Sequence, residues 1–469
     1  MKWIKRILIF VAVLLVSACM GSTKPEYEKK FFDTGYVHTV DVKIAESDWK
    51  DLITHPEHKT KYEADLVIDG EEIEQVSFSA KGNSSLAFVK ASGTSDRYSF
   101  KINFGKKIKG QTFQGLDKLH LQNIFADRTY MKEYLAYDLF RKMDVPAPLC
   151  SYVFVSINGE DFGLYLAVED LDKSFLNRTC NGKGALYQPE LSEQALDDEK
   201  AQALLDGQNA VVAGARGADL NYIDDIPDSY PDIFDNAVTK RSEESERQVI
   251  EAMKGLRDGA DIRSVLDTKE LARYFAVNNY LMNYDTYVGM MTHNYYLYER
   301  NGKLSVFPWD YNLAFGAFPM DAVIDHANDT GEVINMGIDS PLLNVRPEER
   351  PLWTRYLADE TCRKEYHAAM EKLLKEQFDS GAFENETDRV YAMIRPYLAK
   401  DPTAFSTPQE VEKAYEGIKK LCSLRTESIH RQLNGSLASE TAQQDPANRV
   451  APEGVNVTDL GSLKLLSDQ

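Results

Sequence analysis

Residues 283–312 read NYDTYVGMMTHNYYLYERNGKLSVFPWDYN, and this stretch carries the clearest structural pattern in the chain. It contains two strand-like segments around a tight turn, residues 295–300 and 303–307 on either side of Asn301-Gly302. Asn-Gly favours a two-residue hairpin turn, and this register brings Asn294 and Asp310 to the same end of the hairpin. A regular pleat would place these two side chains on opposite faces. Pro308 cannot donate to the strand ladder, so we expect regular pairing to stop there and the chain to turn.

A predicted helix over residues 267–283 leads into this stretch. Asp267 is placed to cap its first turn, with Glu270 three residues further on, and its apolar residues recur at helical spacing. The helix delivers Asp285 beyond its C-terminal end, where the helix dipole disfavours a carboxylate. A carboxylate in such a place indicates a nearby cation or a functional use.

An Asp at a helix end, an Asn, a hairpin and a second Asp repeat the layout of the catalytic half of a protein kinase. In that layout the first Asp orients or deprotonates the acceptor hydroxyl, and the Asn and second Asp hold magnesium ions that bridge the phosphates. Here those positions are Asp285, Asn294 and Asp310, and hard oxygen ligands suit magnesium. The spacing of nine positions from Asp285 to Asn294 departs from ordinary kinases, and Trp309-Asp310-Tyr311 is not Asp-Phe-Gly.

Residues 37–170 are expected to form a β-rich unit, mainly an antiparallel sheet. Two hairpins are predicted, residues 62–68 with 73–80 around Asp69-Gly70 and residues 153–157 with 162–168 around Asn158-Gly159. The alternation over residues 98–104 places Lys101 on the face opposite its apolar neighbours. An apolar stripe at i, i+4 spacing predicts a helix over residues 127–143 that Asp127 can cap.

Residues 171–433 are expected to be mainly helical. The predicted helices span residues 242–257, 267–283, 361–377, 385–399 and 408–433. Residues 203–235 are rich in Gly, Asp and Asn and are expected to form a long loop, and residues 434–469 are expected to be a disordered tail. The pattern predicts an α+β domain over residues 37–433, with a β-rich N-terminal lobe and a mainly helical C-terminal lobe.

The N-terminus resembles a bacterial lipoprotein signal. A basic start precedes a short apolar run that ends Val16-Ser17-Ala18-Cys19, which is similar to a lipobox. The resemblance implies that residues 1–18 are removed, that Cys19 is acylated, and that residues 19–36 link the domain to the extracytoplasmic face of the bacterial membrane. A plain secretory signal with a chance cysteine is the alternative.

Charge and cysteine usage restrict the partners. The chain of 469 residues has a formal net charge of −20, which argues against a nucleic-acid surface. The four other cysteines are Cys150, Cys180, Cys362 and Cys422. Their even number permits disulfides in an exported protein, isolated buried thiols are the alternative, and their spacing indicates no zinc site.

Several motifs occur together in one order. They are Lys81-Gly82-Asn83-Ser84-Ser85, Tyr98-Ser99-Phe100-Lys101, Phe162-Gly163-Leu164-Tyr165 with Glu169, Asp285 to Tyr298, and Pro308-Trp309-Asp310. This set resembles the spore coat protein H (CotH) family of atypical protein kinases over roughly residues 60–400, here as a lipoprotein member. The resemblance implies a two-lobed kinase-like fold, ATP with Mg²⁺ or Mn²⁺ as cofactors, and transfer of the γ-phosphate to Ser or Thr of extracytoplasmic or spore-coat proteins.

The resemblance also implies a role for each site residue. Lys101 would contact the nucleotide phosphates, with Glu133 as its partner, and Asp285 would be the catalytic Asp with Asn294 and Asp310 as metal ligands. The loop over the phosphates would be Gly82, Asn83 and Ser84. Glu169 would contact the nucleotide, and a solvated acidic turn is its alternative.

Three classes of function remain open from the sequence. The first is phosphoryl transfer to Ser or Thr, and the second is a catalytically inactive cell-surface scaffold that binds nucleotide, metal or a cell-wall partner. The third is a carbohydrate-active enzyme, which would use two carboxylates as acid and base but needs no strand lysine. His293 is open as a general base or a structural hydrogen-bonding residue, and Trp309 and Tyr311 are expected to pack.

Overall fold

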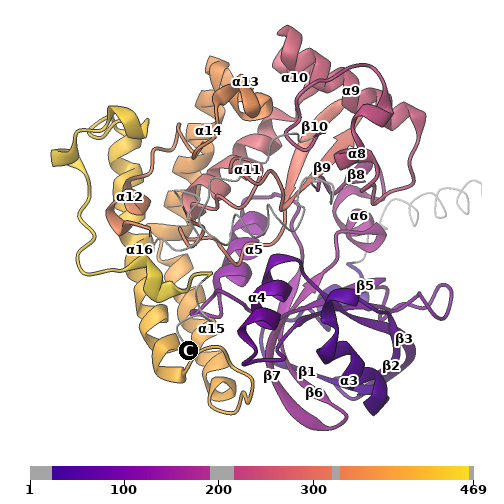
Figure 1. The fold of residues 1–469 in the computed structure, drawn as a ribbon. Helices are drawn as coiled ribbons and strands as arrows, with labels where there is room; N and C mark the ends of the chain where they lie inside the picture. The colour runs from indigo at the N-terminus through magenta and orange to yellow at the C-terminus, as the bar shows by residue number, and fades with distance from the viewer. Residues whose placement is uncertain (1–23, 191–215, 320–327, 464–469) are drawn as a thin grey trace, which may run out of the picture.

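The computed structural model describes residues 24–190, 216–319 and 328–463. Helices and strands are both abundant, consistent with the predicted α+β class (Figure 1). The expected signal segment and Cys19 lie outside the described residues. Within the described residues, no helix is both long enough and apolar enough to cross a membrane.

Seven strands form a closed barrel in the order β1-β2-β3-β4-β5-β7-β6. Their bounds are β1 His38–Ile44, β2 Tyr62–Ile68, β3 Glu71–Lys81, β4 Ser99–Asn103, β5 Lys118–Gln122, β6 Cys150–Ile157 and β7 Glu160–Glu169. Both predicted hairpins are present, as β2–β3 and β6–β7. The expected antiparallel sheet is closed by one parallel pair, in which Val40 of β1 lies beside Val155 of β6. Closure removes the free edges that an open sheet would expose.

Alternation along the strands separates an apolar interior from a polar outer face. Phe100 and Ile102 of β4 are buried in the barrel core, and Lys101 between them points outward, as predicted. Lys101 pairs in register with Ser79 of β3 and His120 of β5. Polar side chains from three adjacent strands therefore lie together on the outside of the barrel.

Helix α5 (Lys132–Lys142) lies between the barrel and the helical part of the chain (Figure 1). The helix begins five residues later than predicted, with Met131 in place of Asp127 as its N-cap residue. The Asp127 carboxylate still accepts the backbone N–H of Lys132 at 2.8 Å, from the turn that leads into the helix. Short helices that flank the barrel are α2 Glu26–Lys29, α3 Glu46–Thr54, α4 Ser84–Ser92 and α6 Lys173–Cys180.

A second sheet is built around the hairpin predicted from the opening stretch. Strands β9 (Tyr295–Arg300) and β10 (Lys303–Pro308) pair in the expected register, and the pairing ends at Tyr295 with Pro308. A third strand, β8 (Ala185–Tyr187), pairs with β9 and was not predicted. Three residues are too few for a periodic signal in the sequence.

The five predicted helices are present. They are α9 Glu243–Asp258, α11 Thr268–Leu281, α14 Glu360–Leu373 with a π-turn at Leu374–Phe378, α15 Ala382–Leu398 and α16 Pro408–Leu433. Shorter helices are α8 Pro231–Phe234, α10 Ile262–Val265, α12 Thr330–Asn335 and α13 Pro351–Ala358. A long loop is expected over residues 203–235. Its first part, up to residue 215, lies outside the described residues, and α8 interrupts the part that is described.

The segment after Asn434 corrects the expectation of a disordered tail. Val450, Val457 and Leu460 are buried in the same apolar core as α11 and α16, and the backbone of Leu460 accepts the N–H of Arg128. These apolar residues are spaced without a period, so the sequence pattern does not reveal that they pack. Residues 464–469 lie outside the description.

The four cysteines within the described residues are free and buried. They are therefore isolated buried thiols, the alternative to disulfides that the sequence left open. Removal from water raises the pKa of Cys150, Cys362 and Cys422 to about 12, which disfavours the reactive thiolate.

Candidate functional site

The polar outer face of β3, β4 and β5 meets α5 and the end of the β9–β10 hairpin. Lys81 is the last residue of β3, and its Nζ donates to Gln122 Oε1 of β5 at 2.8 Å. The same Nζ lies 5.5 Å from the ring centroid of Trp309. Burial lowers the pKa of the Lys81 ammonium, and the nearby carboxylates of Asp310 and Glu133 act in the opposite direction. Lys81 therefore lies among the groups that the sequence predicted to be functional.

Glu133 of α5 is buried on the other side of this cluster. Its Oε1 accepts a hydrogen bond from the Tyr137 hydroxyl at 2.8 Å, and the Tyr137 oxygen accepts the backbone N–H of Asp310 at 3.0 Å. Burial and the charge of Asp310 together raise the pKa of Glu133 to about 8, although Lys81 acts in the opposite direction. The acid on α5 is thus tied to the Asp310 backbone through one tyrosine.

Lys101 has a different partner from the one that the resemblance implied. Its Nζ lies 2.8 Å from Asp170 Oδ2, and His120 Nε2 lies 3.3 Å from the same oxygen. Lys118 is 3.7 Å from that oxygen as well. Burial acts to raise the pKa of Asp170, but these three groups outweigh it and hold the pKa well below its ordinary value. Glu133 instead lies near Lys81, so two lysines point to the same region.

The loop Gly82-Asn83-Ser84 follows Lys81 and leads directly into α4, which begins at Ser84. Gly82 has a φ of +103°, a backbone conformation that favours glycine, and a Cβ there would lie 2.8 Å from the rotatable Ser85 Oγ. The Asn83 side chain accepts a hydrogen bond from Lys59 at 2.7 Å. The loop therefore places the first turn of a helix next to Lys81.

The structure brings Asp285 and Asn294 together. Asn294 Nδ2 donates to Asp285 Oδ2 at 2.9 Å, and His293 Nε2 lies 3.2 Å from Asp285 Oδ1. Asp285 is buried, and this burial raises the pKa of its carboxyl group, with Asp310 as a further source of negative charge. One oxygen of Asp285 is therefore held by Asn294 and the other faces His293, and both residues belong to the chain that enters the hairpin.

Asn294 and Asp310 do not lie on opposite faces of the hairpin, as a regular pleat would place them, because neither residue has a strand conformation. Asn294 has a φ of +55° and Asp310 a φ of +54°, so both residues adopt the left-handed conformation just outside the paired strands. Apart from glycine, Asn and Asp are the residue types that adopt this conformation most readily. Such residues are often found at functional sites, where the surrounding structure holds them. The two side chains leave the pleat and are turned toward Asp285 and α5.

Glu169, Trp309 and Tyr311 are engaged by neighbouring side chains or backbone. Glu169 is fully buried, and its carboxylate accepts hydrogen bonds from Tyr27, Arg178 and the backbone of Leu149. Its neighbour Asp170 is the acid that contacts Lys101. Trp309 and Tyr311 pack, as expected: Trp309 lies edge-on to His120, and the Tyr311 hydroxyl donates to Asn278 at 2.8 Å.

Sequence reasoning missed four residues at this site, which are Lys81, His120, Tyr137 and Asp170. Lys81 stands at the start of the motif that contains Gly82, so its position was visible but its role was not. The others are brought to the site by strand register and by the packing of α5, and local patterns carry no signal for either.

The residues present fit a magnesium ion that arrives with a nucleotide. Within the described residues, the Asp310 carboxylate takes part in no hydrogen bond or ion pair. The side-chain nitrogen of Asn294 donates its hydrogen bond to Asp285, which leaves the amide oxygen of Asn294 available to a metal ion. No group of three or more His, Cys, Asp or Glu in these residues could hold a metal ion alone. Magnesium commonly takes one or two protein ligands and completes its shell with water and phosphate oxygens.

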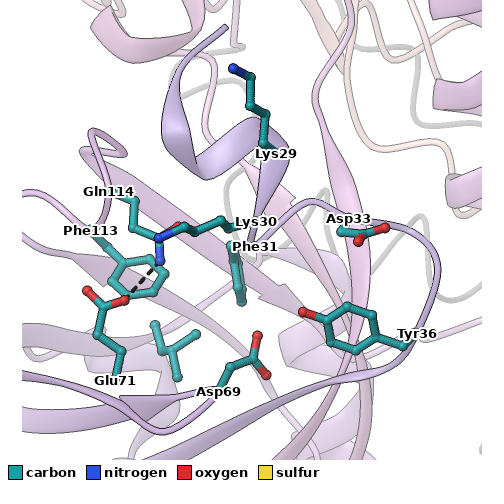
Figure 2. A pocket seen from close by; sticks show the side chains of 10 residues that line it. Lys29, Lys30, Phe31, Asp33, Tyr36, Asp69, Glu71, Phe113 and Gln114 are labelled. Atoms are coloured by element: carbon teal, nitrogen blue, oxygen red, sulfur yellow. Dashed lines mark hydrogen bonds between the residues drawn. The ribbon is translucent and has the colours of Figure 1, made fainter.

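A cavity of about 380 Å³ lies elsewhere, at the barrel end beneath α2 (Figure 2). Its wall includes Lys30, Tyr36 and Asp69, and Gln114 donates to Glu71 at 3.0 Å across it. Figure 2 shows that the lining combines cations, carboxylates and aromatic rings without one dominant chemistry. None of the predicted site residues lines this cavity.

The chain is similar to two known proteins and matches one family model. The chain is 25% identical over 307 residues to the inner spore coat protein H of Bacillus subtilis. The matched region covers 65% of this chain and 74% of that protein. The chain is also 33% identical over 75 residues to an inner spore coat protein H-like protein of the same organism, covering 16% of this chain and 23% of that protein. A family model described as CotH kinase protein matches residues 78–429, which is more than half of the chain. The chain therefore belongs to the CotH kinase protein family.

Proposed function

We propose that this protein is an atypical kinase that transfers the γ-phosphate of ATP to Ser or Thr of an extracytoplasmic or spore-coat protein. The observation that carries the proposal is a convergence of elements beside the Asp285–Asn294 pair. Lys81 lies over the ring of Trp309, and Glu133 is linked through Tyr137 to the backbone of Asp310. A cation for phosphates, a carboxylate for a metal and a carboxylate for a hydroxyl proton are the groups that phosphoryl transfer requires. The name of the similar spore coat protein supports the substrate class.

In this proposal the barrel and the helical part act as the two lobes of a kinase-like fold, and the nucleotide binds between them. Lys81 contacts the phosphates, and Lys101, held by Asp170, supplies a second positive charge. The first backbone N–H groups of α4, after Gly82-Asn83, favour a bound anion. Asp310 and Asn294 hold Mg²⁺ or Mn²⁺, which would neutralise charge on the phosphates.

Asp285 then orients the acceptor hydroxyl. The hydroxyl oxygen forms a bond to the γ-phosphorus as the bond to the bridging oxygen of ADP breaks, and the hydroxyl proton passes to Asp285. Burial raises the pKa of Asp285, which makes the carboxylate a better proton acceptor than an exposed aspartate. The hydrogen bond from Asn294 keeps the carboxylate oriented for this step.

The same proposal places the protein outside the cytoplasmic membrane. Val16-Ser17-Ala18-Cys19 resembles a lipobox, and acylation of Cys19 would anchor the chain to the membrane. The spore coat relative supports a surface location. No nucleic acid is expected as a partner, because the net charge is −20.

The test is an assay of the purified protein with labelled ATP and Mg²⁺ or Mn²⁺, scored for phosphate on the protein itself and on candidate coat proteins. Asp310→Ala should abolish metal-dependent nucleotide binding and transfer together. Asp285→Ala should spare binding while transfer falls by about 10²–10⁴-fold. Lys81→Met should weaken nucleotide binding more than Lys101→Met, because Lys81 lies over Trp309, next to Asp310, whereas Lys101 is paired with Asp170.

Two results would remove the kinase proposal. Wild-type protein that binds ATP tightly but never transfers phosphate to any acceptor would support the inactive scaffold. Cleavage of a glycan that is unaffected by Lys81→Met would support a carbohydrate-active enzyme, since such an enzyme needs only the carboxylates.

A further inference from the structure

We infer that Tyr137 is a positioning residue that sets the backbone of Asp310, and with it the aim of the metal-binding carboxylate. The inference rests on the proposed function, because it assigns a task to a residue next to the proposed metal ligand. Its basis is a pair of buried hydrogen bonds, from Asp310 N–H to Tyr137 at 3.0 Å and from Tyr137 to Glu133 at 2.8 Å.

The chemistry of the three groups fixes the direction of these bonds. A backbone N–H can only donate, so the Tyr137 oxygen must accept from Asp310. The single hydroxyl hydrogen of Tyr137 is then free for Glu133, whose Oε1 accepts it. Tyr137 has no solvent exposure, so water cannot replace either partner. The hydroxyl is therefore held on both sides.

The segment around Asp310 is held at two points. Asp310 has a φ of +54°, outside the strand conformation, and follows directly after the end of β10 and Trp309, so its direction is not set by the strand ladder. Asn312 adds a second contact, because its Nδ2 donates to the carbonyl of Phe125 in the loop before α5 at 3.1 Å. The segment that carries Asp310 is thus fixed to α5 and to the loop that leads into it.

Tyr137 lies at the centre of this support. It is four residues after Glu133, one turn along the same face of α5, so the helix presents the acid and the tyrosine together. Loss of the hydroxyl would leave the ring packed but would free the Asp310 backbone. We expect the metal to bind more weakly, because partners that orient a metal ligand are typically worth about 10- to 100-fold in metal affinity.

The experiment compares Tyr137→Phe with Tyr366→Phe in the full protein. Tyr366 of α14 is a matched control, because its buried hydroxyl also accepts one hydrogen bond, from Asn279 at 3.1 Å, and donates one, to the carbonyl of Ile338 at 2.7 Å. Binding of Mn²⁺ in the presence of a non-hydrolysable ATP analogue is followed by electron paramagnetic resonance, and thermal melts are recorded without metal. Asp310→Ala serves as the reference for loss of the metal site.

We expect similar melting temperatures for the two tyrosine variants and a Kd for Mn²⁺ raised about 10- to 100-fold in Tyr137→Phe alone. Equal Mn²⁺ affinities for the two variants, with binding abolished by Asp310→Ala, would overturn the inference and leave the proposed function standing. Wild-type protein that binds no Mn²⁺ with the analogue would overturn the proposed function, and the inference with it.

If Tyr137→Phe does not fold, a second pair tests the same point. Glu133→Gln keeps an oxygen that can accept from Tyr137, and Glu133→Met does not, while both remove the same charge. The inference expects weaker Mn²⁺ binding in Glu133→Met than in Glu133→Gln. Equal affinities for this pair would count against it.

Discussion

Removal of residues 435–469 should destabilise the whole domain, although the composition of this segment is polar. Four of its side chains are almost completely buried, with exposures of 2% for Leu437, 5% for Val450, 2% for Val457 and 0% for Leu460. Burial of an aliphatic side chain of this size contributes about 1.5–3 kcal/mol, so the four together contribute roughly 6–12 kcal/mol as an upper range. The free energy of unfolding of a typical domain is about 5–15 kcal/mol. The truncated chain should therefore be largely unfolded or aggregated.

The assay is urea unfolding followed by circular dichroism, with point variants to bracket the effect. Leu460→Ala should lower the free energy of unfolding by about 2–5 kcal/mol, because it opens a cavity beside α16. Glu440→Ala, at an exposed position of the same segment, should change it by less than about 0.5 kcal/mol. A truncated protein that unfolds at the same urea concentration as the full chain would refute this reasoning.

Three other predictions follow from single sites. Gly163 has a φ of +149°, and a Cβ there would lie 2.4 Å from Asp401 Oδ1 and 2.5 Å from Arg97 Nη1. Gly163→Ala should therefore break the buried Arg97–Asp401 ion pair and lower the free energy of unfolding by at least about 3 kcal/mol. Its control is Gly159→Ala, at a φ of +85°, where an added Cβ would have no atom within 4 Å. This control should lose about 1–2 kcal/mol of stability from backbone strain alone, and equal losses of stability in the two variants would contradict the predicted clash. Burial raises the pKa of Glu270 to about 7, so the folded state holds a proton that the unfolded state has lost, and stability should fall as pH rises from about 4.5 through 7. Glu270→Gln should make this fall smaller in thermal melts between pH 5 and 8, while the part caused by Glu133, whose pKa is also raised by burial, should remain. A wild-type profile parallel to that of the variant would count against the prediction. Cys19→Ala should release the protein from bacterial membranes or leave it unprocessed, and mass spectrometry that finds an unmodified mature N-terminus at another residue would exclude the anchor.

Much of the secondary structure follows from local sequence. The Asp69-Gly70, Asn158-Gly159 and Asn301-Gly302 turns define their hairpins because few residues adopt the backbone that such turns require. The five long helices follow from apolar residues at helical spacing and from caps such as Asp267, whose carboxylate accepts the Glu270 N–H at 3.1 Å. The order of Asp285, Asn294 and Asp310 around one hairpin also follows from the sequence, since a hairpin brings its two ends together whatever surrounds it.

Contacts between distant parts of the chain decided the rest. The parallel pairing of β1 with β6 closes the barrel across more than a hundred residues, and no local pattern encodes it. The motif at Phe162-Gly163-Leu164 is explained only by the tertiary structure, where the Leu164 N–H donates to Asp401 at 2.9 Å and the absent side chain of Gly163 leaves room for Arg97.

The same distinction applies to the choice among charged residues. Lys81 and Lys101 both point outward from the barrel, and Glu169 and Asp170 are adjacent in the sequence, so strand patterns treat the members of each pair alike. Strand register and the position of α5 determine that Lys81 lies near Glu133 and Asp310, that Lys101 contacts Asp170, and that Glu169 is held in a buried network with Arg178. Sequence patterns determine which face a side chain occupies, but only the packing of one element against another determines the charge that it meets there.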